Sequence, residues 1–220
     1  MDGFIGALDE DERSALHQRG TRRRFGRGAY LFLEGERSDH IIVLLSGQVK
    51  VSSFADDGRE AVLAIRGPGE LIGELASLDA GPRSASVSAV DPVEALVLDA
   101  ASFRAYLHEH PRIALMLLQT VIGKLREANR KRVEFATLDV TGRVARRLVE
   151  LAERFGERVE DGDAIVVHTP LSQDELASWT GASRKAIVNA LRTLRSRGWI
   201  DTGRRQFVVR DIDAVRRRAT

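Results

Sequence analysis

Short apolar runs separated by glycines fill residues 29–98, and this pattern restricts the fold more than any other feature of the chain. The runs span residues 29–33, 41–45, 48–51, 61–65, 84–89 and 92–98. Between two of them, Asp56-Asp57-Gly58-Arg59 has the composition of a hairpin turn. Strands this short with turns this frequent are typical of an antiparallel roll or sandwich. We therefore expect an α+β protein whose N-terminal part is an antiparallel β-roll.

A long helical pattern follows the expected roll. Pro111 opens it, and it continues to about Ala136 with an apolar stripe at spacings of three and four residues. This stripe favours the seam of a parallel, two-fold coiled-coil dimer, and packing of the helix on the roll is the alternative. The stripe and its neighbours, which form the expected dimer interface, are Leu118, Val121, Ile122, Leu125, Asn129, Arg132, Phe135 and Ala136.

The last third of the chain has the pattern of two short helices joined by a tight turn. Ser172 begins the first helix with a capping box, Gly181 makes the turn, and Ser183 caps the second helix. Two strands around the turn Thr202-Gly203-Arg204-Arg205 then have the pattern of a wing. The chain thus divides into a β-roll with flanking helices, a dimerisation helix with a hinge, and a winged helix-turn-helix, over residues 1–110, 111–138 and 139–220.

Basic residues concentrate toward the C-terminus, although the net charge is only +2. Residues 141–220 contain 16 Lys and Arg against 11 Asp and Glu, and residues 183–220 contain 11 against 3. A basic end on a slightly acidic body favours a polyanionic partner at that end, and a solvated basic tail is the alternative.

The exposed face of the second short helix carries groups that suit base edges in the DNA major groove. Arg184 can offer two donors to a guanine, Asn189 can pair with an adenine, and Lys185 can contact a phosphate. The arginines at the tip of the wing can neutralise phosphates or enter the minor groove, and plain solvation is the alternative for each side chain. The expected contacts with double-stranded DNA are Ser172, Ser183, Arg184, Lys185, Val188, Asn189, Arg204 and Arg205.

Composition excludes several other classes of protein. The chain has no cysteine, which removes disulfides, thiolate zinc sites and cysteine-ligated iron–sulfur clusters. The five histidines lack metal-ligand spacing, and no apolar run reaches the ~20 residues that span a bilayer. Neither a signal peptide, nor a nucleophile–base set, nor a P-loop is recognisable. We therefore expect a cytoplasmic protein that is not an enzyme and has neither a cofactor, nor a metal, nor a membrane partner.

Two neighbouring segments, Ile72-Gly73-Glu74-Leu75-Ala76 and Gly81-Pro82-Arg83-Ser84-Ala85, bring a carboxylate and a guanidinium onto a glycine-framed loop. Arg83 can bind phosphate oxygens with its planar set of donors, and Glu74 can accept a hydrogen bond from a ribose 2′-hydroxyl. Gly73 lets the backbone approach the ligand closely. This set suits a cyclic nucleotide, and a turn with a surface ion pair is the alternative.

At these segments the chain resembles the catabolite-activator (cyclic AMP receptor) and fumarate-nitrate regulator family of bacterial transcription factors. The two segments look like the phosphate-binding cassette of that family, residues 138–143 look like its hinge, and residues 172–194 look like its helix-turn-helix. The resemblance implies a dimeric, sequence-specific DNA-binding regulator that a cyclic nucleotide controls. It also implies a pseudo-palindromic operator and RNA polymerase as further partners.

In this family the long helix reaches the base of the nucleotide from both subunits, at positions that correspond to Ala128 and Asn129. The hydroxyl expected at position 128 is missing, whereas Ser84 favours cyclic AMP over cyclic GMP by resemblance. Lys185 and Asn189 also depart from the acidic residue and the arginine of the best-known members, so the preferred DNA sequence should differ. The expected ligand-binding residues are Leu63, Gly73, Glu74, Leu75, Ala76, Arg83, Ser84, Ala85, Ala128 and Asn129.

Two alternatives to a cyclic AMP-controlled regulator stay open. One is a regulator of the same family that binds DNA without nucleotide or responds to a different effector. The other is a cyclic nucleotide-binding scaffold that has no DNA activity.

Overall fold

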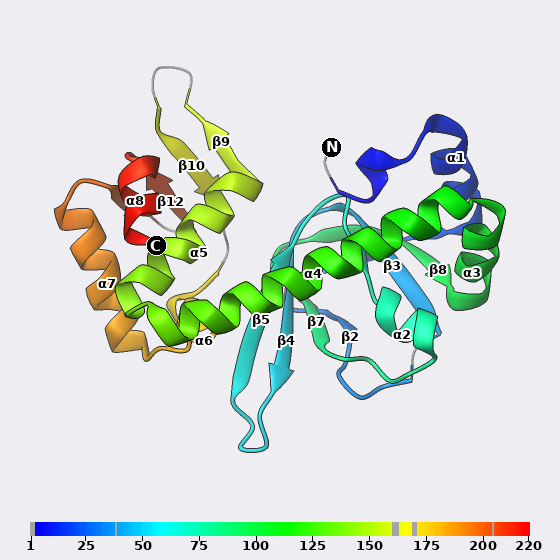
Figure 1. Cartoon of the computed structure of the whole chain (residues 1–220), viewed down its shortest axis with the longest axis horizontal. Coiled ribbons are helices and arrows are strands. Elements are labelled where there is room, and N and C mark those ends of the chain that lie inside the picture. The colour runs from blue at the N-terminus through cyan, green and yellow to red at the C-terminus, as the bar shows by residue number, and fades with distance from the viewer. Residues whose placement is uncertain (1–2, 38, 160–162, 169–170, 204) are drawn as a thin grey trace. The chain divides into compact units, whose positions relative to one another are not determined.

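The structure is a computed structural model that describes residues 3–37, 39–159, 163–168, 171–203 and 205–220. The chain forms two compact units, Met1–Glu127 and Ala128–Thr220. The division falls inside the long helix α4 (Pro111–Thr137), which is green in Figure 1. The helix therefore contributes residues to both units, and the three-part functional division expected from the sequence stays a prediction.

Two four-stranded antiparallel sheets make up the body of the first unit, which confirms the predicted β-roll. Their strand orders are β1-β8-β3-β6 and β2-β7-β4-β5. The strands are β1 (Thr21–Phe25), β2 (Tyr30–Phe32), β3 (His40–Ser46), β4 (Val49–Phe54), β5 (Glu60–Arg66), β6 (Leu71–Ile72), β7 (Ser86–Ala89) and β8 (Val93–Asp99).

Strand β3 lies between the two hydrophobic cores of this unit. Ile41 and Val43 face one core, whereas Ile42 and Leu44 face the other, and all four side chains are fully buried. Successive side chains of a strand point to opposite faces of the sheet, so a strand buried on both faces needs an unbroken apolar sequence. This requirement explains why residues 41–45 do not alternate with polar residues.

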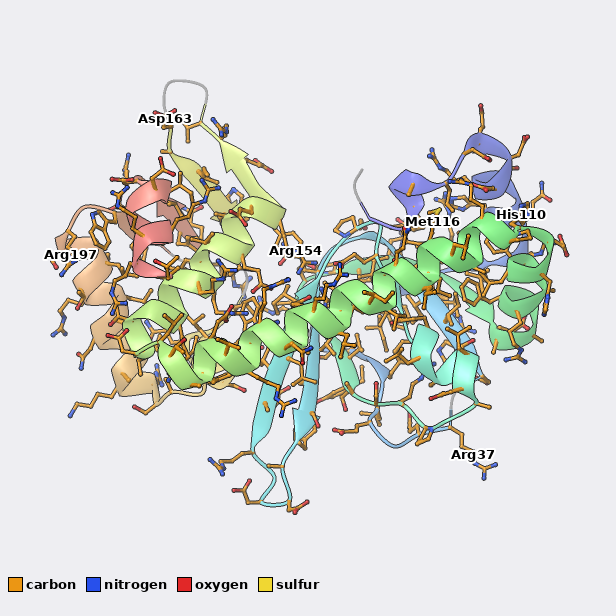
Figure 2. All side chains as sticks on the ribbon, in the orientation of Figure 1. Arg37, His110, Met116, Arg154, Asp163 and Arg197 are labelled. Carbon is orange, nitrogen blue, oxygen red and sulfur yellow. The ribbon has the colours of Figure 1, made fainter. Side chains whose placement is uncertain are left out.

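Helices cover one of the two cores and fix the start of α4 on the roll. They are the short η1 (Ile5–Ala7), α1 (Glu10–Arg19) and α3 (Ala100–Glu109), while α2 (Glu74–Asp79) follows β6. The hydroxyl of Tyr106 donates to the main-chain oxygen of Glu12 over 2.8 Å, which joins α3 to α1. The ring of His110 lies 4.8 Å from that of Tyr106, and Met116 of α4 packs against the same core (Figure 2).

The second unit is a winged helix-turn-helix, as predicted. Its sheet has the order β11-β12-β10-β9, and its core includes the buried side chains of Leu148, Ile187 and Leu194. The elements are α5 (Val140–Phe155), β9 (Gly156–Arg158), β10 (Ile165–His168), α6 (Gln173–Thr180), α7 (Arg184–Ser196), β11 (Ile200–Gly203), β12 (Gln206–Val209) and α8 (Ile212–Arg218).

The break between α4 and α5 is short. Of residues 138–143, which resemble a hinge, only Leu138 and Asp139 lie outside the two helices. The side chain of Asp139 accepts a hydrogen bond from the main-chain nitrogen of Gly142 over 2.7 Å, so it caps α5 and lets helix begin at Val140.

Candidate functional site

Arg83 is a cation buried in the roll, with only 4% of its surface exposed. Its Nη1 donates to the main-chain oxygen of Gly73 over 3.1 Å, and its Nη2 donates to that of His40 over 2.6 Å. The guanidinium carbon lies 3.4 Å from the centroid of the Phe32 ring. Burial lowers the pKa of Arg83 to about 10, so the side chain stays charged at neutral pH.

The geometry at Gly73 requires glycine. Its φ is +85°, in the left-handed region that side chains rarely adopt, and it precedes the first residue of α2. A β-carbon at this position would lie 2.2 Å from Nη1 of Arg83. The Gly73 backbone therefore lies close to Arg83, and its predicted close approach to a ligand stays a prediction.

Glu74 is also buried, and its partner is a residue that the sequence reasoning missed. Only 3% of Glu74 is exposed, and Nζ of Lys124 donates to its Oε1 over 2.9 Å. The same ammonium donates to the main-chain oxygen of Leu71 over 3.1 Å. Lys124 lies 50 residues away on α4, where the only signal in the sequence is a charged residue off the leucine stripe. Among the described residues, Lys124 is the only side chain found to donate to the Glu74 carboxylate.

A second ion pair, also missed, joins α4 to the roll three residues further along the helix. Nη2 of Arg66 lies 3.0 Å from Oε2 of Glu127, and Nη1 of Arg66 lies 3.6 Å from Oε1 of Glu70. Residues three apart lie on the same side of a helix, so Lys124 and Glu127 present one charged side of α4 to the roll.

The other predicted ligand residues differ in exposure. Leu63 and Leu75 are large apolar side chains that are 43% and 42% exposed, and Ser84 is exposed as well. Ala76 is buried, and Ala85 is partly buried. Arg83 therefore contacts Gly73 directly, and Glu74 is the next residue along the chain. Ala128 and Asn129 are exposed residues of the second unit.

The apolar stripe of α4 is uncovered. Leu118 and Leu125 are 56% and 61% exposed, and Ile122 is also exposed, whereas Ile113 and Leu117 are buried on another side of the helix. Leu115 is 64% exposed and extends the stripe by three residues toward the N-terminus, which the sequence analysis missed. Along the same stripe, Val121 is partly buried and Asn129, Arg132 and Ala136 are exposed.

Phe135, which the sequence analysis placed at the dimer interface, has a contact inside the second unit. A β-carbon at Gly181 would lie 2.7 Å from its ring, and the guanidinium of Arg143 lies 5.4 Å from the ring centroid. Gly181 is the left-handed residue that ends α6. Phe135 therefore packs against the turn of the helix-turn-helix, and its place in a dimer interface stays a prediction.

The helix-turn-helix has the caps that the sequence predicts. Ser172 and Glu175 form the complete capping box of α6, and Ser183 accepts a hydrogen bond from the nitrogen of Ala186 at the start of α7. Beyond the cap, Arg184, Lys185 and Asn189 are exposed and Val188 is partly buried.

On this face of α7, Arg184 forms a weak, exposed ion pair. Nη1 of Arg184 lies 3.7 Å from Oδ2 of Asp174, and both side chains are about two-thirds exposed. An exposed ion pair of this kind contributes at most about 1 kcal/mol, so Arg184 can be redirected toward another anion at little cost. In the wing, Arg205 is exposed with a φ of +59°, and Arg204 lies outside the described residues. Arg197, another exposed basic side chain, follows α7 (Figure 2).

In the part of the chain that the structure describes, no group of three or more His, Cys, Asp or Glu residues could hold a metal ion. Nor does any helix there combine the length and apolarity needed to cross a membrane.

Two family descriptions match the chain, one for each unit. "Cyclic nucleotide-binding domain" matches residues 22–110, and "Crp-like helix-turn-helix domain" matches residues 142–218. The CRP-like cAMP-activated global transcriptional regulator of Mycobacterium tuberculosis is 37% identical over 217 residues, which cover 99% of this chain and 96% of the relative. The Cyclic AMP receptor protein of Thermus thermophilus is 30% identical over 86% of this chain and 84% of the relative.

Solved structures give the same fold. FixK2 from Bradyrhizobium japonicum has a TM-score of 0.80 at 21% identity, covering 91% of this chain and 98% of that one. A CRP-family transcriptional regulator of Thermus thermophilus has a TM-score of 0.74 at 27% identity, covering 90% and 96%. The c-di-GMP responsive global regulator CLP of Xanthomonas campestris has a TM-score of 0.76 at 24% identity, covering 91% and 99%. The Mycobacterium tuberculosis relative and the second Thermus thermophilus protein are named as transcriptional regulators, and none of these names describes an enzyme.

Proposed function

Because this chain belongs to the CRP family of bacterial transcription regulators, with a cyclic nucleotide-binding domain and a DNA-binding domain, we propose that it is a homodimeric regulator controlled by cyclic AMP. The observation that carries this proposal is the buried, charged Arg83 beside Gly73 and Glu74. A planar guanidinium binds two phosphate oxygens at once, and water-excluded surroundings strengthen that contact. Cyclic GMP is the less favoured ligand.

In the proposed complex, Arg83 binds the cyclic phosphate and Glu74 accepts a hydrogen bond from the ribose 2′-hydroxyl. Lys124 contacts Oε1 of Glu74, which leaves Oε2 for the ribose. Leu63 and Leu75, both exposed, supply apolar surface for the nucleoside. Ala128 and Asn129 are the proposed contacts to the base.

The proposed dimer uses the uncovered stripe of α4. Its exposed leucines at spacings of three and four residues have the pattern of a coiled-coil seam. A two-fold dimer would present two copies of α7 to DNA, and such readers bind half-sites one helical turn, about 34 Å, apart. The proposed operator is therefore pseudo-palindromic, and RNA polymerase is the proposed further partner.

Calorimetric titration of the full-length protein with cyclic AMP, cyclic GMP and cyclic di-GMP tests which nucleotide the protein binds. We expect saturable heat with cyclic AMP, weaker binding of cyclic GMP, and loss of both in Arg83→Leu. If the wild-type protein gives no heat with cyclic AMP, the ligand proposal is wrong and the DNA-binding assignment is unaffected.

A second candidate is a regulator that binds DNA without nucleotide or answers another effector. It is favoured by Ala128, which lacks the hydroxyl that the family uses for base recognition. Measuring operator affinity with and without cyclic AMP separates the two candidates, because only the first requires the affinity to change.

A further inference from the structure

Phe32 forms a flat support under the guanidinium of Arg83. The ring is 4% exposed, and its centroid lies 3.4 Å from the guanidinium carbon. We propose that Phe32 is a positioning residue for ligand binding, which holds Arg83 in the orientation that receives the cyclic phosphodiester. This inference rests on the proposed function, since it assigns Phe32 a role in that same site.

Three contacts fix the guanidinium, and they restrict it in different ways. The main-chain oxygens of Gly73 and His40 each accept one of its hydrogen bonds, which sets two of its edges. The Phe32 ring covers one of its faces. A guanidinium has five N–H donors, so up to three remain for a ligand, and all of them lie in a plane that the ring has set.

Arg83 has no carboxylate in direct contact. Among the described residues, no carboxylate is found within ion-pair distance of this buried side chain, and Asp39, Glu36 and Glu74 act on its charge only from further away. Buried charges are normally paired with an opposite charge, because isolated ones are costly. Carbonyl oxygens and an aromatic face stabilise the cation only partly, so the site keeps an unsatisfied preference for an anion.

The ring itself is held by the roll. Phe32 ends β2, belongs to the core cluster that includes Ile42 and Leu44, and lies with its centroid 5.0 Å from that of His40. A β-carbon at Gly73 would lie 3.0 Å from the Phe32 ring, in addition to its contact of 2.2 Å with Nη1 of Arg83. The ring of Phe32 is therefore fixed in the core and would stay in place if the side chain of Arg83 moved. A positioning role requires such a fixed support.

The experiment compares Phe32→Leu with the wild-type protein and with Phe54→Leu, a control at an exposed phenylalanine of β4 in the same sheet. We expect Phe32→Leu to weaken cyclic AMP binding by about tenfold, the upper end of the cost of immobilising one rotamer-rich side chain on binding, and Phe54→Leu to leave it unchanged. Adenosine, which lacks the phosphate, is titrated in parallel by NMR. A positioning role lowers the affinity for cyclic AMP and spares adenosine, whereas general loosening of the roll lowers both.

Two further measurements keep the proposal testable if Phe32→Leu does not fold. Phe32→Met introduces a flexible apolar side chain of similar volume that has no aromatic face. It should show the same selective loss of affinity for cyclic AMP. In the wild-type protein, the guanidinium protons of Arg83, assigned by their absence in Arg83→Leu, should resonate upfield because they lie over an aromatic ring.

The outcomes separate this inference from the proposed function. Wild-type protein that binds no cyclic nucleotide overturns both. Wild-type binding that persists unchanged in Phe32→Leu or Phe32→Met, an equal loss of cyclic AMP and adenosine binding, or guanidinium resonances without an upfield shift overturns the role of Phe32 alone.

Discussion

The candidate ligand site depends on single residues whose neighbours come from distant parts of the chain. Gly73, Glu74 and Arg83 are recognisable from sequence because they lie within 11 residues and form a local motif. Other contacts of the loop and of α4 cannot be recognised from sequence, because only folding brings their residues together. They involve Lys124, Phe32 and the Arg66–Glu127 pair. Local spacing therefore predicts the residues of the loop and not the contacts that hold it.

Gly73→Ala should weaken cyclic AMP binding by more than tenfold, because the new β-carbon would displace Nη1 of Arg83. The left-handed backbone at this position adds a stability cost of about 1–2 kcal/mol. Calorimetry measures the first effect, and urea unfolding the second. Gly58→Ala is the matched control, since Gly58 also has a positive φ but nothing lies within 4 Å of the place that a β-carbon would take there. Equal affinities in the two variants would contradict this account.

Asp139 links the start of α5 to the C-terminal helix α8 through Arg218, whose Nη2 lies 2.5 Å from Oδ1. The Arg218 hydrogen bond and then that from Gly142 hold the pKa of Asp139 below its usual value. A carboxyl whose pKa is lowered by folding stabilises the protein above its unfolded pKa, about 3.9, and loses this contribution as pH falls through the folded value.

Asp139→Ala should therefore lower the free energy of unfolding by about 1–2 kcal/mol at pH 7, the range for loss of a helix cap. The difference from wild type should shrink toward pH 3 and below. Both tryptophans, Trp179 and Trp199, lie in the second unit, so fluorescence during urea unfolding reports on this unit. A difference that does not change with pH would show that the charge of Asp139 has no part in it.

At the level of helices and strands, the sequence predicts elements that carry their own signals. The capping box begins α6 where Ser172 predicts, since a cap needs only residues three positions apart. Strand β1 escaped prediction because Arg22, Arg23 and Arg24 break the apolar pattern; it exists through main-chain pairing with β8. Such an edge strand depends on a partner about 70 residues away, which no local pattern reveals.

The uncovered stripe of α4 leads to a prediction about assembly. Leu118→Glu together with Leu125→Glu should convert a dimer into a monomer of 24.3 kDa, because the charges would face each other across the proposed seam. Analytical ultracentrifugation measures the mass. Leu33→Glu, at an exposed leucine beyond β2, is the control and should stay dimeric. A wild-type protein that sediments as a monomer at micromolar concentration would contradict the proposed seam.

In helix α7 we expect Arg184 to contact a base and Lys185 to contact a phosphate. Arg184→Ala should cost about 1–3 kcal/mol on the preferred operator and relax the choice of base at one position, as loss of a bidentate base contact does. Lys185→Ala should weaken binding to all sequences alike and reduce the salt slope by about 1. Binding measured on a randomised library at several salt concentrations separates the two. Identical profiles for both variants would remove the base-reading role of Arg184.

For the whole molecule, the proposal requires that a ligand in the first unit changes what the second unit binds. A ligand shifts such an equilibrium only by its unequal affinity for the two states, and typical couplings change affinity about 5- to 150-fold. In the proposed regulator, Arg83 supplies the anion site and α7 supplies the DNA contacts, while α4 contributes residues to both units.

The most direct test is the affinity of the full-length protein for an operator selected from random DNA, measured by fluorescence anisotropy with and without saturating cyclic AMP. We predict that cyclic AMP tightens binding by at least about tenfold in the wild-type protein and has no effect in Arg83→Leu. Equal wild-type affinities in the presence and absence of cyclic AMP would contradict the central claim.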